Sequence, residues 1–138
     1  MGTTQLAVFL ENKAGRLAEV TRVLGDANVN IRGFSVADTS EYGILRLIVD
    51  DPDRAYSALK DHAFTVHASK VLCVRVPDHP GALAAALDAL SRRNINVEYM
   101  YPIGIAVIVF GVEKVDEAAA ALQSEGVTVL REDDVKKL

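Results

Sequence analysis

The sequence is poor in cysteine, has fewer basic than acidic residues, and lacks long apolar runs. Cys73 is the single cysteine among 138 residues, so no internal disulfide can form, as is usual in a reducing compartment. The net charge of −4 argues against a nucleic-acid partner, because such binding draws on clustered Lys and Arg. No apolar run is long enough to cross a bilayer, and residues 1–4 show no signal-peptide pattern. We therefore expect a cytoplasmic protein with no membrane and no nucleic-acid partner.

Recognisable catalytic and metal-binding patterns are missing as well. No Ser/His/Asp set, paired carboxylates or glycine-rich phosphate loop stands out. The histidines, His62, His67 and His79, are too scattered for a metal site. Cys73 has no basic neighbour in the sequence to activate it, so we expect a buried, inert thiol. The sequence thus predicts no enzyme activity, no cofactor and no metal.

What the sequence does contain is an internal duplication. The stretch Asn12–Leu17 is matched 66 positions later by Asp78–Leu83, and each stretch follows an apolar run and opens a helical pattern. Each helical pattern ends in Asn-x-Asn, at Asn28–Asn30 and at Asn94–Asn96, again 66 positions apart. A fixed offset held through strand, turn, helix and next strand indicates a repeat. We expect two units of about 65 residues, whose thin cores need to pack on one another or on another chain.

Hydrophobic periodicity predicts the order βαββαβ in each unit. The first unit has predicted strands at 5–10, 29–36, 43–49 and 64–67, with helices at 14–27 and from 52 onward. The second has strands at 71–76, 95–101, 103–112 and 127–130, with helices at 80–93 and 113–124 and a turn at Pro102. The fold class is therefore α+β: two tandem ferredoxin-like units, each an antiparallel sheet with helices on one face.

The expected domains are residues 1–68 and 70–131, joined by a linker at Ala68–Lys70 and followed by a charged, solvated tail at 132–138. Asn28 and Asn94 suit the left-handed position just after a helix end. The stretch Ile105–Phe110 is apolar on both faces, as a strand covered on both sides would be. From this strand we expect a homodimer built through the helix-free sheet faces.

A strand followed by Glu11–Leu17, a helix and Asn28–Ile31 resembles the ACT domain, a small regulatory module that binds amino acids. The second unit resembles it too, and its turn Asp78–Gly81 keeps the proline-glycine form usual in the family. The resemblance covers the chain from Gln5 to about Arg131, and stand-alone tandem ACT proteins are the most similar type. It implies a protein that binds a free amino acid and regulates an enzyme or transporter in trans, because no catalytic domain is attached.

The ligand-binding residues that the resemblance implies fall in a turn and a strand of each unit. In the first unit they are Asn12, Lys13, Ala14, Gly15, Arg16, Leu17, Asn30 and Ile31. In the second unit they are Asp78, His79, Pro80, Gly81, Ala82, Leu83, Asn96 and Val97. In the family the matching strand position contacts the ligand across a domain interface. The resemblance therefore implies a site between one unit's turn and another unit's second strand, with Asn12 and Asn30 as the strongest pair.

The chemistry of the turn suits a zwitterion. Unpaired N–H groups at the start of a helix favour a carboxylate, and Gly15 or Gly81 lets the backbone approach a ligand closely. The amide of Asn12 can accept from the ammonium and donate to the carboxylate, whereas the carboxylate of Asp78 holds an ammonium but repels a carboxylate. Alternatively, Asn12 and Asp78 are only helix N-caps, and the glycines only turn residues.

Three other functions compete with the amino-acid sensor. One is a regulatory subunit of a biosynthetic enzyme, such as the small subunit of acetolactate synthase, whose turn and first helix look similar. Another is a pure oligomerisation module without a ligand. The third is an RNA-binding protein, which the acidic balance and the missing basic-aromatic signature on the third strand disfavour.

Overall fold

The computed structural model describes residues 2–38 and 41–138, which divide into two compact units. The first unit contains Thr4–Ser69, and the second contains Lys70–Lys136 together with Gly2 and Thr3. Each unit has its own hydrophobic core. No helix within the described ranges has both the length and the apolar character needed to span a bilayer.

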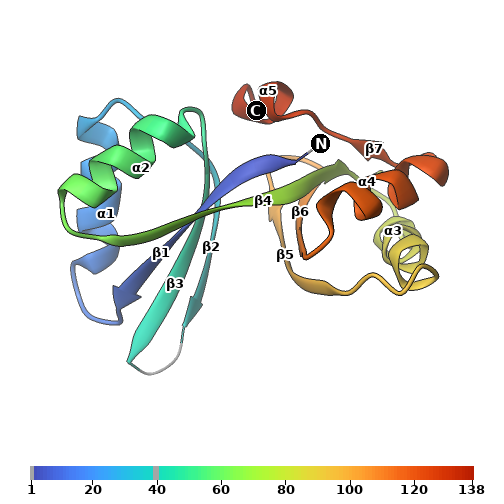
Figure 1. Cartoon of the computed structure of the whole chain (residues 1–138), viewed down its shortest axis with the longest axis horizontal. Coiled ribbons are helices and arrows are strands. Elements are labelled where there is room, and N and C mark those ends of the chain that lie inside the picture. Colours follow the sequence, from blue (N-terminus) through green and yellow to red (C-terminus); the bar gives the residue numbers. More distant parts are fainter. Residues whose placement is uncertain (1, 39–40) are drawn as a thin grey trace. The chain divides into compact units, whose positions relative to one another are not determined.

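The first unit has the predicted βαββαβ order (Figure 1). Its elements are β1 (Thr3–Glu11), α1 (Arg16–Asp26), β2 (Ile31–Asp38), β3 (Tyr42–Val49), α2 (Pro52–Asp61) and β4 (Thr65–Arg75). The strands follow the order β2-β3-β1-β4. The helices α1 and α2 contact each other on one side of these strands, and apolar side chains between the helices and the sheet form the core. This is the ferredoxin-like arrangement.

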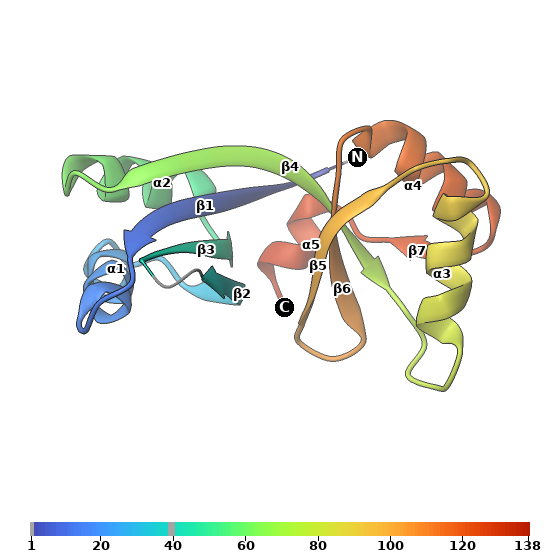
Figure 2. The same ribbon diagram turned by 90° about the horizontal axis from the view of Figure 1, so that it is seen from below.

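The second unit repeats the arrangement and uses the end of β4 as its first strand. Its further elements are α3 (Ala82–Ser91), β5 (Val97–Ile103), β6 (Val107–Val112), α4 (Val115–Ser124), β7 (Thr128–Val129) and α5 (Glu132–Lys136). The strand order is β5-β6-β4-β7, and α3 and α4 lie side by side (Figure 2). The predicted fold class, two tandem ferredoxin-like units, is confirmed.

Two boundary regions differ from the expectation. Ala68–Lys70, expected as a linker, is part of β4, because no glycine or proline interrupts residues 65–75. The tail, expected to be solvated, contains the short helix α5, in which Val135 is fully buried. Acidic side chains in the first turn of α5 stabilise this helix, because its N-terminal end carries a partial positive charge. The carboxylate of Glu132 also pairs with Lys70 at 3.3 Å.

The hairpin between β5 and β6 turns later than the sequence predicted. Its turn is Gly104–Ala106, in which Gly104 and Ala106 have φ of 55° and 57°. Pro102 is not the turn but a strand residue opposite Ile108; because β5 is an edge strand, the missing N–H of Pro102 is tolerated there. Consequently Ile105 lies at the turn and is 86% exposed, while both faces of β6 itself are largely buried.

The expected buried thiol is confirmed at Cys73. The pKa of this thiol is raised to about 11, mainly because the group is buried; Thr3 lowers the pKa and the charge of Glu132 raises it, and both effects are included in that value. Such a group stays protonated at neutral pH, so it is a poor nucleophile.

All four long helices end in the same hydrogen-bonded motif. In each, a residue with positive φ follows the helix, and the next N–H donates to a carbonyl five residues earlier, for example Phe64 to Leu59 at 3.0 Å and Val127 to Leu122 at 3.0 Å. The positive-φ residues are Asn28, Ala63, Asn94 and Gly126. The prediction that Asn28 and Asn94 take the left-handed position after a helix end is therefore confirmed. Ala63 is the unusual residue at this position, because alanine rarely adopts a positive φ.

Replacing Ala63 by glycine should stabilise the protein. Ala63 has φ of 64°, a conformation that costs a residue with a Cβ about 1–2 kcal/mol, part of which the extra freedom of glycine in the unfolded chain offsets. We expect Ala63→Gly to raise the free energy of unfolding by about 0.5–1 kcal/mol and Gly126→Ala, its mirror at φ of 79°, to lower it by a similar amount. Chemical denaturation of both variants tests this, and a less stable Ala63→Gly would contradict it.

Candidate ligand-binding site

The two duplicated turns have nearly the same backbone conformation. Gly15 precedes α1 with φ of 89° and ψ of −12°, and Gly81 precedes α3 with φ of 86° and ψ of −11°. A Cβ at either glycine would meet no atom within 4 Å. Glycine is therefore required by the left-handed backbone and not by crowding, and the space beside each helix start is open.

Hydrogen bonds within the turns repeat with the same offset. The N–H of Lys13 donates to Glu11 O at 2.9 Å, and the N–H of His79 donates to Pro77 O at 2.9 Å. The first N–H of each helix also donates to its turn: Arg16 to Lys13 O at 3.4 Å, and Ala82 to His79 O at 3.3 Å. The sequence duplication is thus a duplication of geometry, although Ala14 replaces proline in the first turn.

Asn12 and Asp78 are not the N-cap residues of the helices. Helix α1 begins at Arg16 and α3 at Ala82, and the N-cap positions are the glycines at 15 and 81. Both side chains are exposed in the turn ahead of the helix. The backbone N–H of Asn12 donates to Glu41 O at 2.8 Å, which holds the turn against the start of β3. The interpretation of Asn12 and Asp78 as simple caps is therefore wrong.

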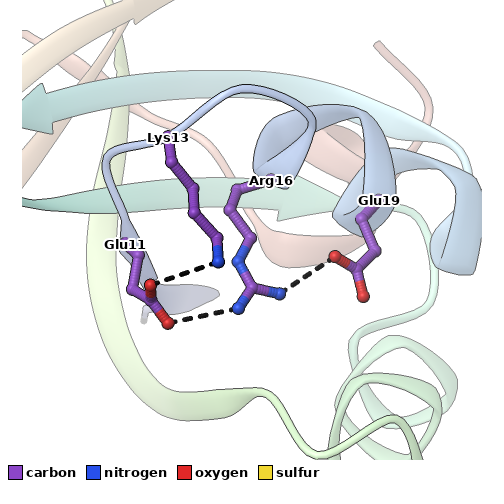
Figure 3. A network of polar contacts seen from close by, with 4 residues as sticks. All are labelled: Glu11, Lys13, Arg16 and Glu19. Atoms are coloured by element: carbon purple, nitrogen blue, oxygen red, sulfur yellow. Dashed lines mark hydrogen bonds and ion pairs between the residues drawn. The ribbon is translucent and has the colours of Figure 1, made fainter.

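A network of charged side chains occupies the first turn (Figure 3). Arg16 lies between two carboxylates and donates to Glu19 at 3.0 Å and to Glu11 at 3.2 Å, while Lys13 pairs with Glu11 at 3.4 Å. Hydrogen bonding from Arg16, together with the charge of Lys13, lowers the pKa of the Glu11 carboxyl. The hydrogen bonds to Glu19 and Glu11 raise the pKa of the Arg16 guanidinium. The four charges sum to zero, so this turn carries polar groups without a net charge.

The second turn has no such network. The positions that match Glu11, Arg16 and Glu19 are Pro77, Ala82 and Ala85. The two turns therefore share a backbone but offer different side chains.

The strand residues of the expected site lie far from the turn of their own unit. Strand β3 pairs with Glu11 at its first residue, Tyr42, and with Ile31 at its last, Val49. Seven strand steps separate these ends by about 23 Å. Asn12 and Asn30 are therefore at opposite ends of the sheet, and the same holds for Asp78 and Asn96. The structure gathers the turn residues of each unit in one place, and the strand residues in another.

Asn30 is fixed through its backbone. Its N–H donates to Asp50 Oδ1 at 2.8 Å, and its carbonyl accepts from the Asp50 N–H at 3.0 Å. In the second unit, Asn96 lines a surface pocket of about 400 Å³ together with Asn94 and Glu98. Both asparagine side chains are on exposed residues just before an edge strand.

Sequence reasoning missed a pocket that lies beside each turn at the same place in both units. The volumes are about 440 Å³ in the first unit and 470 Å³ in the second. Residues that line the first pocket include Phe9, Glu11, Arg16, Glu19, His62 and Phe64. The matching residues of the second are Arg75, Pro77, Ala82, Ala85, Glu125 and Val127. Each pocket is also lined by the loop before the last strand, which is distant in sequence from the turn. A position-by-position comparison of the two repeats would have shown that the charged residues of the first turn are not charged in the second.

The fold and the two turns define a tandem pair of ferredoxin-like domains, and comparison with known proteins identifies the family. The family model described as "ACT domain pair" matches residues 1–138. The chain therefore belongs to the ACT domain pair family. A comparison with curated protein sequences finds no match.

Solved structures agree with this assignment. The chain is similar to protein BT0572 from Bacteroides thetaiotaomicron, with 42% identity, a TM-score of 0.94, and coverage of 100% of this chain and 98% of that one. It is also similar to the ligand-free regulatory subunit of aspartate kinase from Thermus thermophilus, with 15% identity, a TM-score of 0.69, and coverage of 91% and 92%. The corresponding subunit from Thermus flavus gives 16%, 0.65, and 90% of each chain. At these identities the two aspartate kinase subunits show a shared fold.

Proposed function

We propose that this ACT domain pair is a non-enzymatic regulatory protein that binds a free amino acid and acts in trans on an enzyme or transporter of amino-acid metabolism. The observation that carries the proposal is the matched, exposed pair of left-handed turns at Gly15 and Gly81, each opening directly into a helix. The first-turn N–H groups of such a helix have no acceptor within the helix and suit a carboxylate. The amide of Asn12 supplies the polar partner for the ligand's ammonium.

A site that contains both Asn12 and Asn30 requires another copy of the chain. Because the first unit places Asn12 and Asn30 at opposite ends of its sheet, one unit cannot bring both to one ligand. We therefore keep the homodimer as part of the proposal, with the Asn30 strand of one copy at the Asn12 turn of the other. The strand expected at Ile105–Phe110 does not call for a second copy, because Ile105 lies in the turn and the residues of β6 are already largely buried in the single chain. The homodimer is supported instead by two apolar side chains of edge strand β2, Phe34 and Val36, which are 62% and 45% exposed and available to pack against a second copy.

The experiment is a thermal melt of the purified chain against each of the twenty amino acids. A ligand that binds the folded state adds about 2.7 kcal/mol at a concentration 100 times its Kd, which raises the midpoint by several degrees. We expect one amino acid, or a chemically related few, to do so, and light scattering of that complex to give twice the 14.9 kDa chain mass. Unchanged midpoints with all twenty would leave the oligomerisation module as the better hypothesis.

A regulatory subunit of a biosynthetic enzyme remains the second candidate. The shared fold with the regulatory subunits of aspartate kinase, over about nine-tenths of each chain, favours it. It requires a stable complex with a large catalytic chain, whereas a protein that acts transiently in trans elutes at its own dimer mass from a native extract.

A further inference from the structure

We propose that the exposed edge of β4 in the first unit binds an extended segment of another protein, which adds to the sheet as a further strand. The segment that fits this edge has apolar side chains at alternate positions and a basic residue beside them. This surface goes beyond the amino-acid site at the first turn and does not depend on it. Through such a surface a regulatory protein contacts the protein that it regulates.

The edge of β4 is open over residues 65–69. Strand β1 pairs with one side of β4, and β6 and β7 pair with β4 only from Leu72 and Val74 onward. Figure 2 shows this part of β4 outermost among the strands of the first unit. Within the described ranges, no strand faces the main-chain groups that point away from β1, and His67, Ala68 and Ser69 are all exposed. An unpaired row of N–H and C=O groups is a template for another strand.

The other sheet edges carry features that discourage pairing with a foreign strand. Strands β2 and β5 each have an irregular register near their first residues, and β5 also contains Pro102, which lacks an N–H. Strand β7 has 2 residues. Bulges, prolines and short strands are the usual protections of a sheet edge. Residues 65–69 contain no proline, glycine, lysine or carboxylate, so this edge is the one best suited to accept a strand.

A groove beside the edge receives the side chains of the added strand. It has a volume of about 420 Å³ and lies between the start of α2 and strands β1 and β4. Its apolar lining comes from Leu6, Pro52, Tyr56 and Ala68. Ala68 alternates with Val66, which is buried in the first core, so it lies on the same face of β4 as the helices. Every second side chain of an added strand points to that face, so alternate apolar residues match the groove.

The charge of the groove favours a basic residue on the segment. Asp53 is the carboxylate among the lining residues, which include no Lys or Arg. It is exposed and forms no ion pair with a residue in the described part of the chain, whereas the neighbouring Asp51 is paired with Arg54 at 3.5 Å. A free carboxylate beside an apolar groove complements a Lys or Arg next to apolar side chains and disfavours an acidic segment.

The test uses the peptide acetyl-Lys-Thr-Leu-Thr-Leu-Thr-amide as the probe, in a backbone-amide NMR titration of the full chain. Its Lys and Leu side chains share one face when the peptide is extended. We expect saturable shifts at residues 65–69 and in the first turn of α2. Hydrogen exchange should slow at alternate residues of 65–69, those whose N–H points away from β1. With Lys replaced by Gln, the peptide should bind about fivefold more weakly, the upper range for an exposed ion pair.

N-methylated peptides separate strand addition from unspecific apolar contact. Alternate N–H groups of an extended peptide point to the same side. Methyl groups on one alternate set therefore block pairing with β4, while methyl groups on the other set face solvent. We expect only one of the two methylated peptides to bind. Equal binding of both, or of neither, would overturn the proposal, as would the absence of saturable binding of the unmodified peptide at millimolar concentration.

Variants of the chain complete the design. Ala68→Lys fills the groove from an exposed position, and we expect it to abolish binding while the circular dichroism stays that of a folded chain. Asp53→Asn should weaken the probe about fivefold and remove its advantage over the Gln peptide. The matched control is Asp116→Asn, at the same position in the first turn of α4, which should leave binding unchanged.

Two further readouts separate this edge from the other surfaces of the protein. If Ala68→Lys converts a dimer into a monomer in light scattering, the edge is occupied by a second copy and the proposal is wrong. Asn12→Asp should leave the affinity for the peptide unchanged, because Asn12 lies in the turn after β1 and does not line the groove. Failure of the amino-acid site therefore leaves this proposal standing, and the reverse also holds.

Discussion

Gly111→Ala is expected to lower the free energy of unfolding by about 1–3 kcal/mol, the usual cost of overpacking a well-filled site. Gly111 on β6 is paired with Tyr99 on β5, and a Cβ at position 111 would overlap the Tyr99 ring. The ring is half-buried, so it must leave its packing against the strand to make room. Alanine's lower unfolded-state entropy returns only about 0.4–1 kcal/mol, so the clash decides the sign.

Two controls isolate the ring as the cause. In a Tyr99→Ala background the added methyl group has space, so Gly111→Ala should then cost little. Gly25→Ala on the exposed side of α1, where a Cβ meets nothing within 4 Å, should raise stability by about 0.5–1 kcal/mol. Urea denaturation followed by circular dichroism measures all of these. If Gly111→Ala costs the same with and without the ring, the backbone and not the ring is responsible.

In the first unit, the strand pair that matches Tyr99 and Gly111 has the large and the small residue on exchanged strands. There, Gly33 on β2 is opposite Ile48 on β3, and both pairs follow an irregularity in the strand register. One large and one minimal side chain thus fill the position in each unit, on opposite strands. Neither glycine could be assigned this role from the sequence, because each lies in an otherwise ordinary apolar strand.

Periodicity predicted most of the fold because local and tertiary preferences agree there. The alternation of Leu6, Val8 and Leu10 places all three in the first core, and the asparagines at positions 28 and 94 mark helix ends. The hairpin at Gly104–Ala106 was misplaced because proline is a common turn signal, whereas the edge position of β5 makes Pro102 acceptable within a strand. The place of the turn thus depends on a tertiary property, the position of β5 at the edge of its sheet.

The candidate site was predictable in its backbone and less so in its chemistry. The glycine of each turn was correctly placed, because only a residue without a Cβ readily adopts φ near +90°. The ion network around Arg16 was not predicted, since it depends on a strand end and a helical turn meeting in space. The pocket before the last strand was missed for the same reason: its walls come from segments that are distant in the sequence.

Asn12→Asp is expected to weaken the binding of the amino acid that stabilises the protein by about ten- to a hundredfold. The change places a carboxylate beside the ligand's own carboxylate and removes an amide donor, and a lost charge-assisted hydrogen bond costs about 1.5–3 kcal/mol. Folding should be nearly unaffected. Asn12 is exposed, does not cap α1, and holds β3 through its backbone N–H, which the substitution keeps.

Asn30→Ala is the matched variant from the other end of the sheet, and calorimetric titration of both variants with that amino acid is the decisive measurement. The backbone groups of Asn30, and not its side chain, form the hydrogen bonds with Asp50, so truncation should change stability by less than about 0.5 kcal/mol. If a second copy brings this strand to the Asn12 turn, the truncation weakens binding as well, although Asn30 lies about 23 Å from the turn of its own unit. Loss in Asn12→Asp alone would place the ligand at the turn without the second strand. Unchanged affinity in both variants, with unchanged melting midpoints, would move the site away from the first turn altogether.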